Sequence, residues 1–228
     1  MLTAIVTGAS SGIGKDISAK LITSGYKVIG ISRSKPPLED IDWIKADLSN
    51  QIDIEEALEE VKNKTKEINL LVNNAAVMKT NKISNINFND ISTSFTLNVC
   101  TPLFLTSSLT KQLSRGKATV VFIGSVASEL DIPGELLYST TKAAISKLNS
   151  GFSSELTRLG IKYFEVRPGI CKTPMTENLN EKSIDYMISK TAYNKMVSLD
   201  SVSETVLNTI TLPITCSGSI LYCGGIKR

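Results

Sequence analysis

The stretch TGASSGIG at residues 7–14 decides the fold, because it joins a strand pattern to a helical pattern. The run LTAIVT at residues 2–7 is typical of a buried strand, and apolar residues recur at helical spacing from Ile13 to Ile22. Glycine allows a tight turn and close approach of the backbone to a ligand, while the helix N-terminus offers unpaired N–H groups. The stretch therefore predicts a strand–turn–helix unit that binds a pyrophosphate. A glycine-rich turn without a ligand is the alternative.

Strand-like apolar runs recur along the whole chain, with helical stretches between most of them. After the first run they lie at residues 27–32, 69–74, 119–125, 162–168 and 219–224, and a further candidate lies around 43–46. This alternation predicts an α/β fold with a doubly wound, Rossmann-like parallel sheet, because parallel strands need crossover helices that cover both faces. With 228 residues and 42% hydrophobic composition, the chain suits a single domain over residues 1–228.

Three segments carry more specific predictions. Asp53 followed by Glu56 resembles a capping box, which predicts a helix that opens at Asp53. A longer helix is predicted over residues 88–113, with a bend at Pro102 because proline cannot donate a backbone hydrogen bond. The paired prolines in residues 34–42 predict a loop or a single turn there, in place of a full crossover helix.

Composition and charge argue against several classes of protein. The net charge is only +3 and the basic residues are scattered, so we expect no nucleic-acid partner. The apolar stretches are short, and no charged leader precedes the first strand, so we expect neither membrane spanning nor export. The four cysteines show no CxxC spacing and the chain has no histidine, which argues against a metal site and against Ser-His-Asp or Cys-His hydrolases. We therefore expect a cytoplasmic protein with reduced thiols.

The end of the second strand run bears on the choice of cofactor. In dinucleotide-binding folds, an acidic residue about 20 residues after the glycines typically binds the adenosine ribose hydroxyls. Here Ser32 stands at that place and Arg33 follows it, so a 2′-phosphate would meet hydroxyls and a cation instead of a carboxylate. The pattern predicts NADP(H) in preference to NAD(H). A solvated arginine at the strand end is the alternative.

The stretch YSTTK at residues 138–142 places a phenol and an ammonium group four residues apart, at the start of a helical pattern. Positions four apart share one face of a helix, so Lys142 could stabilise the phenolate of Tyr138, whose pKa would otherwise lie near ~10. Such a pair also arises by chance, so other motifs must decide whether it is functional.

Taken together, the motifs resemble those of the short-chain dehydrogenase/reductase family, in its branch of single-domain enzymes. TGASSGIG is similar to the cofactor turn of that branch, NNAA at residues 73–76 to its NNAG element, and YSTTK to its YxxxK signature. PGICKT at residues 168–173 is similar to the segment that borders the nicotinamide, and SGSILYCGG at residues 217–225 to the last strand. Ala76 departs from the pattern, because it adds a methyl group where the family usually has glycine.

The resemblance implies a catalytic set of four residues. Tyr138 would be the general acid in carbonyl reduction, and Lys142 would lower its pKa and hold the nicotinamide ribose. Ser125, at a strand end, would bind the substrate oxygen, and Asn98 would support a proton-relay water beside Lys142. Purely structural roles for Asn98 and Ser125 are the alternative, because asparagine often satisfies backbone groups and serine often caps a turn.

The resemblance also implies cofactor contacts along the chain. Asp47 and Leu48 would border the adenine, Asn74 would border the adenosine ribose, and Thr173 would hydrogen-bond the nicotinamide carboxamide unless it serves as a helix cap. The full set implied for the cofactor is Gly8, Ser10, Ser11, Gly12, Ile13, Gly14, Ser32, Arg33, Asp47, Leu48, Asn74, Ala75, Tyr138, Lys142, Pro168, Gly169, Ile170 and Thr173.

By this resemblance the protein would be an NADPH-dependent carbonyl reductase for a small-molecule substrate, reversible as an alcohol dehydrogenase. Residues 126–137 and 174–198 are expected either to close over the ligand or to pack on the core as helices. The length of the second segment and the chain ending are similar to those of 3-oxoacyl-carrier-protein reductases. A homotetramer or homodimer through the helices of Asn98 and Tyr138 is implied as well.

Three other functions stay open. They are an NADP(H)-binding sensor or scaffold without catalysis, an NAD(H)-dependent alcohol dehydrogenase, and an epimerase or dehydratase of the family's extended branch. The intact catalytic set argues against the first, and the TGxxxGxG spacing argues against the third.

Overall fold

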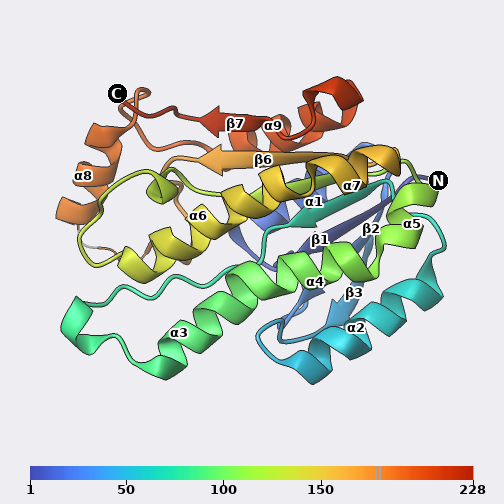
Figure 1. Ribbon diagram of the computed structural model, residues 1–228, viewed down its shortest axis with the longest axis horizontal. Coiled ribbons are helices and arrows are strands. Elements are labelled where there is room, and N and C mark those ends of the chain that lie inside the picture. The colour runs from blue at the N-terminus through green and yellow to red at the C-terminus, as the bar shows by residue number, and fades with distance from the viewer. Residues whose placement is uncertain (178, 180, 228) are drawn as a thin grey trace.

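The computed structural model describes residues 1–177, 179 and 181–227, and seven parallel strands in them form one sheet (Figure 1). The order across the sheet is β3-β2-β1-β4-β5-β6-β7. The strands are β1 (Thr3–Thr7), β2 (Lys27–Ser32), β3 (Ile41–Lys45), β4 (Leu70–Asn73), β5 (Thr119–Ile123), β6 (Lys162–Pro168) and β7 (Ile220–Cys223). The predicted α/β fold with a doubly wound parallel sheet is confirmed.

Helices cover both faces of the sheet, because successive strand residues point to opposite faces. Ala4 and Val6 of β1 share a buried cluster with residues of two helices, α1 (Gly12–Thr23) and α9 (Leu199–Thr211). Ile5 points the other way and belongs to the cluster of the second helical layer. That layer holds α2 (Gln51–Lys64), α4 (Thr101–Ser108), α5 (Thr110–Arg115), α6 (Leu136–Gly151) and α7 (Ser153–Arg158). Figure 1 shows α2, α4 and α6 in front of the sheet and α1 behind it.

The strand order reverses between β1 and β4. From β1 the chain adds β2 and β3 on one side, and then crosses to add β4 to β7 on the other. In open α/β sheets, ligands bind beyond the carboxyl ends of the strands at such a reversal. The helix α8 (Glu181–Lys190) lies beyond the carboxyl ends of β6 and β7 (Figure 1). Short 3₁₀ turns occur at Ile83–Asn85, Val126–Ser128 and Ile214–Cys216.

The predicted start of α2 at Asp53 is wrong by one turn. The N-cap is Asn50, whose side chain accepts hydrogen bonds from the backbone N–H groups of Ile52 and Asp53. Asp53 lies in the first turn of the helix, and its carboxylate accepts the N–H of Asp47 at 2.8 Å. The negative charge therefore lies where it favours the helix dipole, while asparagine supplies the cap.

The helix predicted over residues 88–113 is interrupted twice. It consists of α3 (Phe88–Phe95), a π-helical turn (Thr96–Cys100), α4 and, after a break at Leu109, α5. Pro102 lies in the first turn of α4, directly after the π-helical turn, so its missing N–H falls near the junction of the two segments. The irregularity therefore lies one turn before the proline, in the π-helical turn.

The loop predicted over residues 34–42 is confirmed for residues 34–40, where no helix joins β2 to β3, but β3 already begins at Ile41. The indole N–H of Trp43 donates to the carbonyl oxygen of Ser32 at 3.1 Å, which ties the two strands together where a crossover helix is absent.

Over the part of the chain that the structure describes, no helix is both long enough and apolar enough to cross a membrane.

Candidate active site

A cavity of about 280 Å³ opens at the carboxyl ends of β1 and β4, where the strand order reverses. Its wall runs from the glycine turn after β1, past the loops after β2, β4 and β5, to α6 and the segment that follows β6. All the predicted catalytic and cofactor residues line this cavity except Gly14 and Asn98. Residues that are scattered over the sequence are therefore brought to one place.

The glycine turn shapes one end of the cavity. Gly8 and Gly12 have φ angles of +70° and +51°, in the left-handed region that favours glycine. A Cβ on Gly14 would lie 2.3 Å from the carbonyl oxygen of Gly8, so a side chain would force the helix away from the turn. Ser11 caps α1 without a side-chain capping bond, and the first turn of α1 holds no acidic residue. The turn therefore fits a phosphate, which the free N–H groups and the helix dipole would stabilise.

The ends of β2 and β3 form the outer wall of this part of the cavity. Arg33 is exposed, whereas Ser32 is buried and its hydroxyl donates to the carbonyl oxygen of Ser34 at 2.8 Å. The Asp47 carboxylate accepts the hydroxyl and the N–H of Ser49 at 2.7 and 2.9 Å. These bonds lower the pKa of Asp47, and the charge of Arg33 adds a smaller effect in the same direction. The cation at this wall is therefore in contact with water and near an ionised carboxylate.

The loop after β4 is fastened to β1 by Thr7, the first residue of the TGASSGIG stretch, which was not among the predicted cofactor residues. The Thr7 hydroxyl accepts the backbone N–H groups of Asn74 and Ala75 at 2.9 and 3.0 Å. The side-chain amide of Asn74 donates in turn to the carbonyl oxygen of Thr7 at 2.8 Å. Ala76 is not among the residues with positive φ in the described chain, so this backbone does not require the usual glycine.

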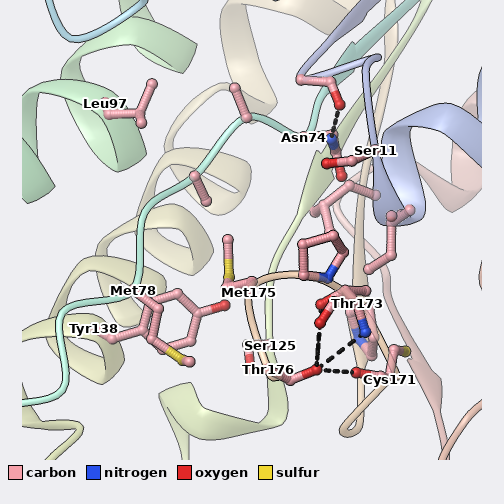
Figure 2. Close-up of a pocket in the computed structure, with 18 of the residues that line it drawn as sticks. Ser11, Asn74, Met78, Leu97, Ser125, Tyr138, Cys171, Thr173, Met175 and Thr176 are labelled. Atoms are coloured by element: carbon pink, nitrogen blue, oxygen red, sulfur yellow. Dashed lines mark hydrogen bonds between the residues drawn. The ribbon is translucent and has the colours of Figure 1, made fainter. Parts of the chain in front are cut away.

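Tyr138 and Ser125 meet at the other end of the cavity. Tyr138 lies in the first turn of α6, and Ser125 follows β5, where its oxygen also accepts the N–H of Ala127 at 3.1 Å. Figure 2 shows the phenol pointing from α6 across the cavity toward Ser125 and Met175. Burial raises the pKa of Tyr138, and the nearby Ser125 side chain acts in the opposite direction. The phenol is therefore held in its protonated form, although the resemblance implies a lowering by Lys142.

Lys142 lies on the same face of α6, one turn after Tyr138. Its ammonium group donates to the carbonyl oxygen of Ile123 at 2.7 Å and lies 5.7 Å from the centre of the Tyr138 ring. The side chain is 4% exposed. Burial lowers the pKa of Lys142 to about 8, and the negative charge of Glu165 opposes this change. A buried cation thus lies beside the phenol with its pKa near neutrality.

Asn98 lies behind the cavity wall, in the π-helical turn. Its side chain accepts the N–H of Val77 at 2.8 Å and donates to the carbonyl oxygen of the same residue at 2.9 Å. It also donates to the hydroxyl of Thr141, the neighbour of Lys142, at 2.9 Å. The side chain therefore connects the loop after β4 with α6 and contacts neither Lys142 nor the cavity directly.

A buried ion pair supports this end of the cavity from β6. Arg167 donates to both oxygens of Glu165 at 2.9 and 3.0 Å, and the two side chains are 2% and 0% exposed. A Cβ on Gly124 would lie 2.1 Å from Glu165 Oε1, so the carboxylate lies directly against the backbone between Ile123 and Ser125. Burial raises the pKa of Glu165. The two-point contact with the guanidinium stabilises its ionised form.

The arginine of this pair also joins several segments. Arg167 donates to the Ser146 hydroxyl on α6 at 2.7 Å and to the Tyr222 hydroxyl on β7 at 2.9 Å. It forms an ion pair with Glu129 in the loop after β5. The elements that carry Lys142 and Ser125 are therefore held to the same buried group.

Comparison with known proteins places the chain in a family. A family model described as short chain dehydrogenase matches residues 2–184. The chain belongs to the short chain dehydrogenase family. Enzymes of this family are oxidoreductases that use nicotinamide cofactors. The fold and the family of this short chain dehydrogenase are therefore those of proteins that bind such a cofactor.

Individual relatives agree with this assignment. A 3-oxoacyl-(acyl-carrier-protein) reductase of Buchnera aphidicola subsp. Baizongia pistaciae is 25% identical over 97% of this chain and 95% of its own length. A short chain dehydrogenase from Burkholderia cenocepacia in complex with NADP has a TM-score of 0.87, with 23% identity over 98% of this chain and 97% of that one. A 4-hydroxyisoleucine dehydrogenase complexed with NADH has a TM-score of 0.90, with 19% identity over 99% of this chain and 98% of that one. The two structures support the fold of the short chain dehydrogenase.

The segment after β6 forms the remaining wall in this short chain dehydrogenase. Thr173 lies opposite the glycine turn, because a Cβ on Gly12 would be 3.2 Å from its methyl carbon. Thr176 holds the segment in place: its hydroxyl accepts the N–H of Thr173 at 3.0 Å and donates to the carbonyl oxygen of Cys171 at 2.8 Å (Figure 2). Thr173 is not a helix cap in the described chain, since the residues after it form turns.

In the two predicted substrate segments, some residues line the cavity and others pack on the core, so both expectations hold in part. The described residues of 174–198 include one helix, α8, whose Met187 packs with Ile132 and Ile170 in a small apolar cluster. Met175 from the same segment and Ile132 from residues 126–137 line the cavity. Helix α8 thus packs on the core, while the segment before it forms part of the cavity wall. The described parts of the short chain dehydrogenase hold no group of acidic or cysteine residues that could bind a metal ion.

Glu135 is a further residue of the site that the sequence motifs did not indicate. It lines the cavity immediately before α6, and burial raises the pKa of its carboxyl group. Its position three residues before Tyr138 is the signal in the sequence, because one helical turn separates the two residues.

Proposed function

We propose that this short chain dehydrogenase is an NADPH-dependent carbonyl reductase, reversible as an alcohol dehydrogenase. The observation that carries the proposal is the placement of the Tyr138 and Ser125 side chains on one wall of a cavity that starts at a phosphate-fitting glycine turn. Two hydroxyl groups aimed at one point suit a carbonyl oxygen, which becomes an alkoxide as it is reduced.

The side chains divide the work of the reaction. When bound, the nicotinamide supplies the hydride for the carbonyl carbon. Ser125 donates a hydrogen bond to the carbonyl oxygen, and Tyr138 transfers its phenolic proton to that oxygen as negative charge develops. A raised pKa keeps Tyr138 protonated before this step. The buried charge of Lys142 then stabilises the phenolate that remains.

The cofactor would lie along the cavity, held by groups at its two ends. The glycine turn would bind the pyrophosphate, and Arg33 would pair with the 2′-phosphate of NADPH. Lys142 would hold the nicotinamide ribose, and Thr173 would hydrogen-bond the carboxamide. Because the Ser32 hydroxyl donates to Ser34, Arg33 is the main basis for the NADP(H) preference. Asp47, which is hydrogen-bonded to Ser49, would border the adenine through its backbone.

The substrate would be a small carbonyl compound. The relative from Buchnera aphidicola is a 3-oxoacyl-(acyl-carrier-protein) reductase, which supports a ketone as the reactive group. We also infer a cytoplasmic homodimer or homotetramer that forms through the α3–α4 region and α6, where the apolar side chains of Phe88, Phe104 and Leu136 are exposed. Light scattering on the purified protein would test the assembly, and a monomer would contradict it.

The experiment that tests the function measures oxidation of NADPH and NADH separately with a panel of acetoacetyl thioesters, diketones and cyclic ketones. We expect turnover with NADPH and a higher kcat/KM than with NADH. Tight NADPH binding without turnover on any ketone would favour a cofactor-binding sensor. A preference for NADH would contradict the role given to Arg33.

A further inference from the structure

The carboxyl group of Glu135 lies on the cavity wall near the proposed proton donor. Glu135 is 1% exposed and is the residue before α6, less than one helical turn from Tyr138. Its negative charge is close enough to raise the pKa of the Tyr138 phenol. The carboxyl group is therefore located near the place where the carbonyl would react.

One oxygen of this carboxyl group has a partner and the other has none. Oε1 accepts the hydroxyl of Thr80 at 2.6 Å. Oε2 is buried and has no hydrogen-bond partner among the described residues. Apolar residues, among them Ile132 and Met187, line the same cavity. Buried carboxyl oxygens are rarely left without a donor, which points to a donor supplied by a bound molecule.

A purely structural role accounts for only half of the side chain. Thr80 binds Oε1, and the N–H of Asn81 donates to the carbonyl oxygen of Gly134 at 3.0 Å, so the two loops are held together without Oε2. Glu135 is also the N-cap residue of α6, but its side chain makes no capping hydrogen bond. Neither the loop contact nor the helix start uses the second oxygen.

We propose that Oε2 of Glu135 accepts a hydrogen bond from a hydroxyl group of the substrate, so that the enzyme acts on hydroxy ketones in preference to plain ketones. This inference rests on the proposed function and names its substrate class. A hydroxyl group suits the apolar wall because it brings no second charge that must be stripped of water. Because Glu135 is only three residues from Tyr138, the hydroxyl is tested on the first and on the second carbon from the carbonyl.

The test compares ketones that differ only in this hydroxyl. Rates with NADPH are measured for 1-hydroxy-2-butanone against 3-pentanone, and for 4-hydroxy-2-butanone against 2-pentanone. We expect the wild-type kcat/KM to favour one hydroxy ketone over its alkyl partner by about tenfold or more, the effect typical of a hydrogen bond to a charged group. In Glu135→Gln this ratio should fall by about tenfold, because a hydrogen bond to a neutral amide replaces the stronger one to a charged carboxylate.

Thr80→Val serves as the matched control. It removes the known partner of Glu135 but keeps the carboxyl group, so the preference for the hydroxy ketone should persist. Equal rates of wild-type enzyme with both members of each pair would overturn the inference and leave the carbonyl reductase proposal intact, even if Glu135→Gln failed to fold. A ratio unchanged in a folded Glu135→Gln, or lost in Thr80→Val alone, would also overturn it. No turnover of any ketone with NADPH would overturn the proposed function, and this inference with it.

Discussion

The two ends of the cavity use charge in opposite ways. At the glycine end, Arg33 is exposed and the phosphate-fitting turn relies on backbone N–H groups. At the catalytic end, Lys142, Glu165 and Glu135 are 4%, 0% and 1% exposed. Water and salt screen the first kind of charge, whereas a buried charge acts strongly on its neighbours. The exposed end is therefore suited to selecting a ligand, and the buried end to setting the protonation of reacting groups.

The largest effect is expected at the buried end from Tyr138→Phe. This change keeps the ring but removes the proton that the carbonyl oxygen needs, so kcat should fall by about 100- to 10,000-fold. NADPH binding, followed by fluorescence titration, should stay close to that of the wild-type protein. Tyr186→Phe is the matched control: its hydroxyl donates to the carbonyl oxygen of Asp131 and does not line the cavity, so activity should change little. Substantial turnover by Tyr138→Phe would show that another group supplies the proton.

A second test removes the negative charge of Glu165, which acts on Lys142, by the substitution Glu165→Gln. Glu165 raises the pKa of Lys142 against the lowering by burial, so its loss should bring that pKa further below about 8. As pH rises, the protonated form of Lys142 would then disappear earlier. The alkaline limb of the kcat/KM profile should therefore move to lower pH, by about one unit.

The control for this test is Glu129→Gln, which removes the outer carboxylate of the same arginine. Glu129 is 40% exposed, so the alkaline limb should shift far less. Glu165→Asp should restore part of the wild-type profile. An alkaline limb that stays in place in a folded Glu165→Gln would contradict the view that buried charge sets the protonation state here.

The smallest effect is expected at the exposed end from Arg33→Ala. The ratio of kcat/KM for NADPH to that for NADH should fall by about tenfold, because one charge-assisted contact to the 2′-phosphate is lost. Since Arg33 is exposed, the wild-type preference should also weaken as salt is added. Lys35→Ala removes a nearby exposed cation that does not line the cavity and should leave the ratio unchanged. A preference that survives Arg33→Ala would place cofactor selection elsewhere.

The sequence predicted the sheet well, because its strands are apolar runs that depend on local pattern. It predicted element boundaries less well where two residues compete for one role. Asn50 and Asp53 both suit a helix start, and only the folded chain shows that Asn50 accepts the first N–H groups. The π-helical turn before Pro102 also carries no signal of its own, since its residues differ little from those of a regular helix.

In the candidate site, too, residues in local motifs could be predicted, whereas residues that depend on distant contacts could not. The glycine turn and the Tyr138–Lys142 pair are local motifs, so their positions follow from short stretches of sequence. Glu135 and Glu165 become informative only through contacts with Thr80 and Arg167 and through burial, which depend on the complete fold. The raised pKa of Tyr138 could not be predicted either. It results from burial of the phenol, which the spacing of residues along the helix does not show.

The π-helical turn at Thr96–Cys100 also limits how the chain can change in length. Such a turn holds one residue more than an α-helical turn, and here it presents Asn98 to both the N–H and the carbonyl oxygen of Val77. Deleting one residue between Asn98 and α4 would rotate Asn98 by about 100° relative to α4. Single-residue insertions and deletions should therefore be rare in this helix among descendants of the gene, while the loop at residues 34–42 stays free to lengthen.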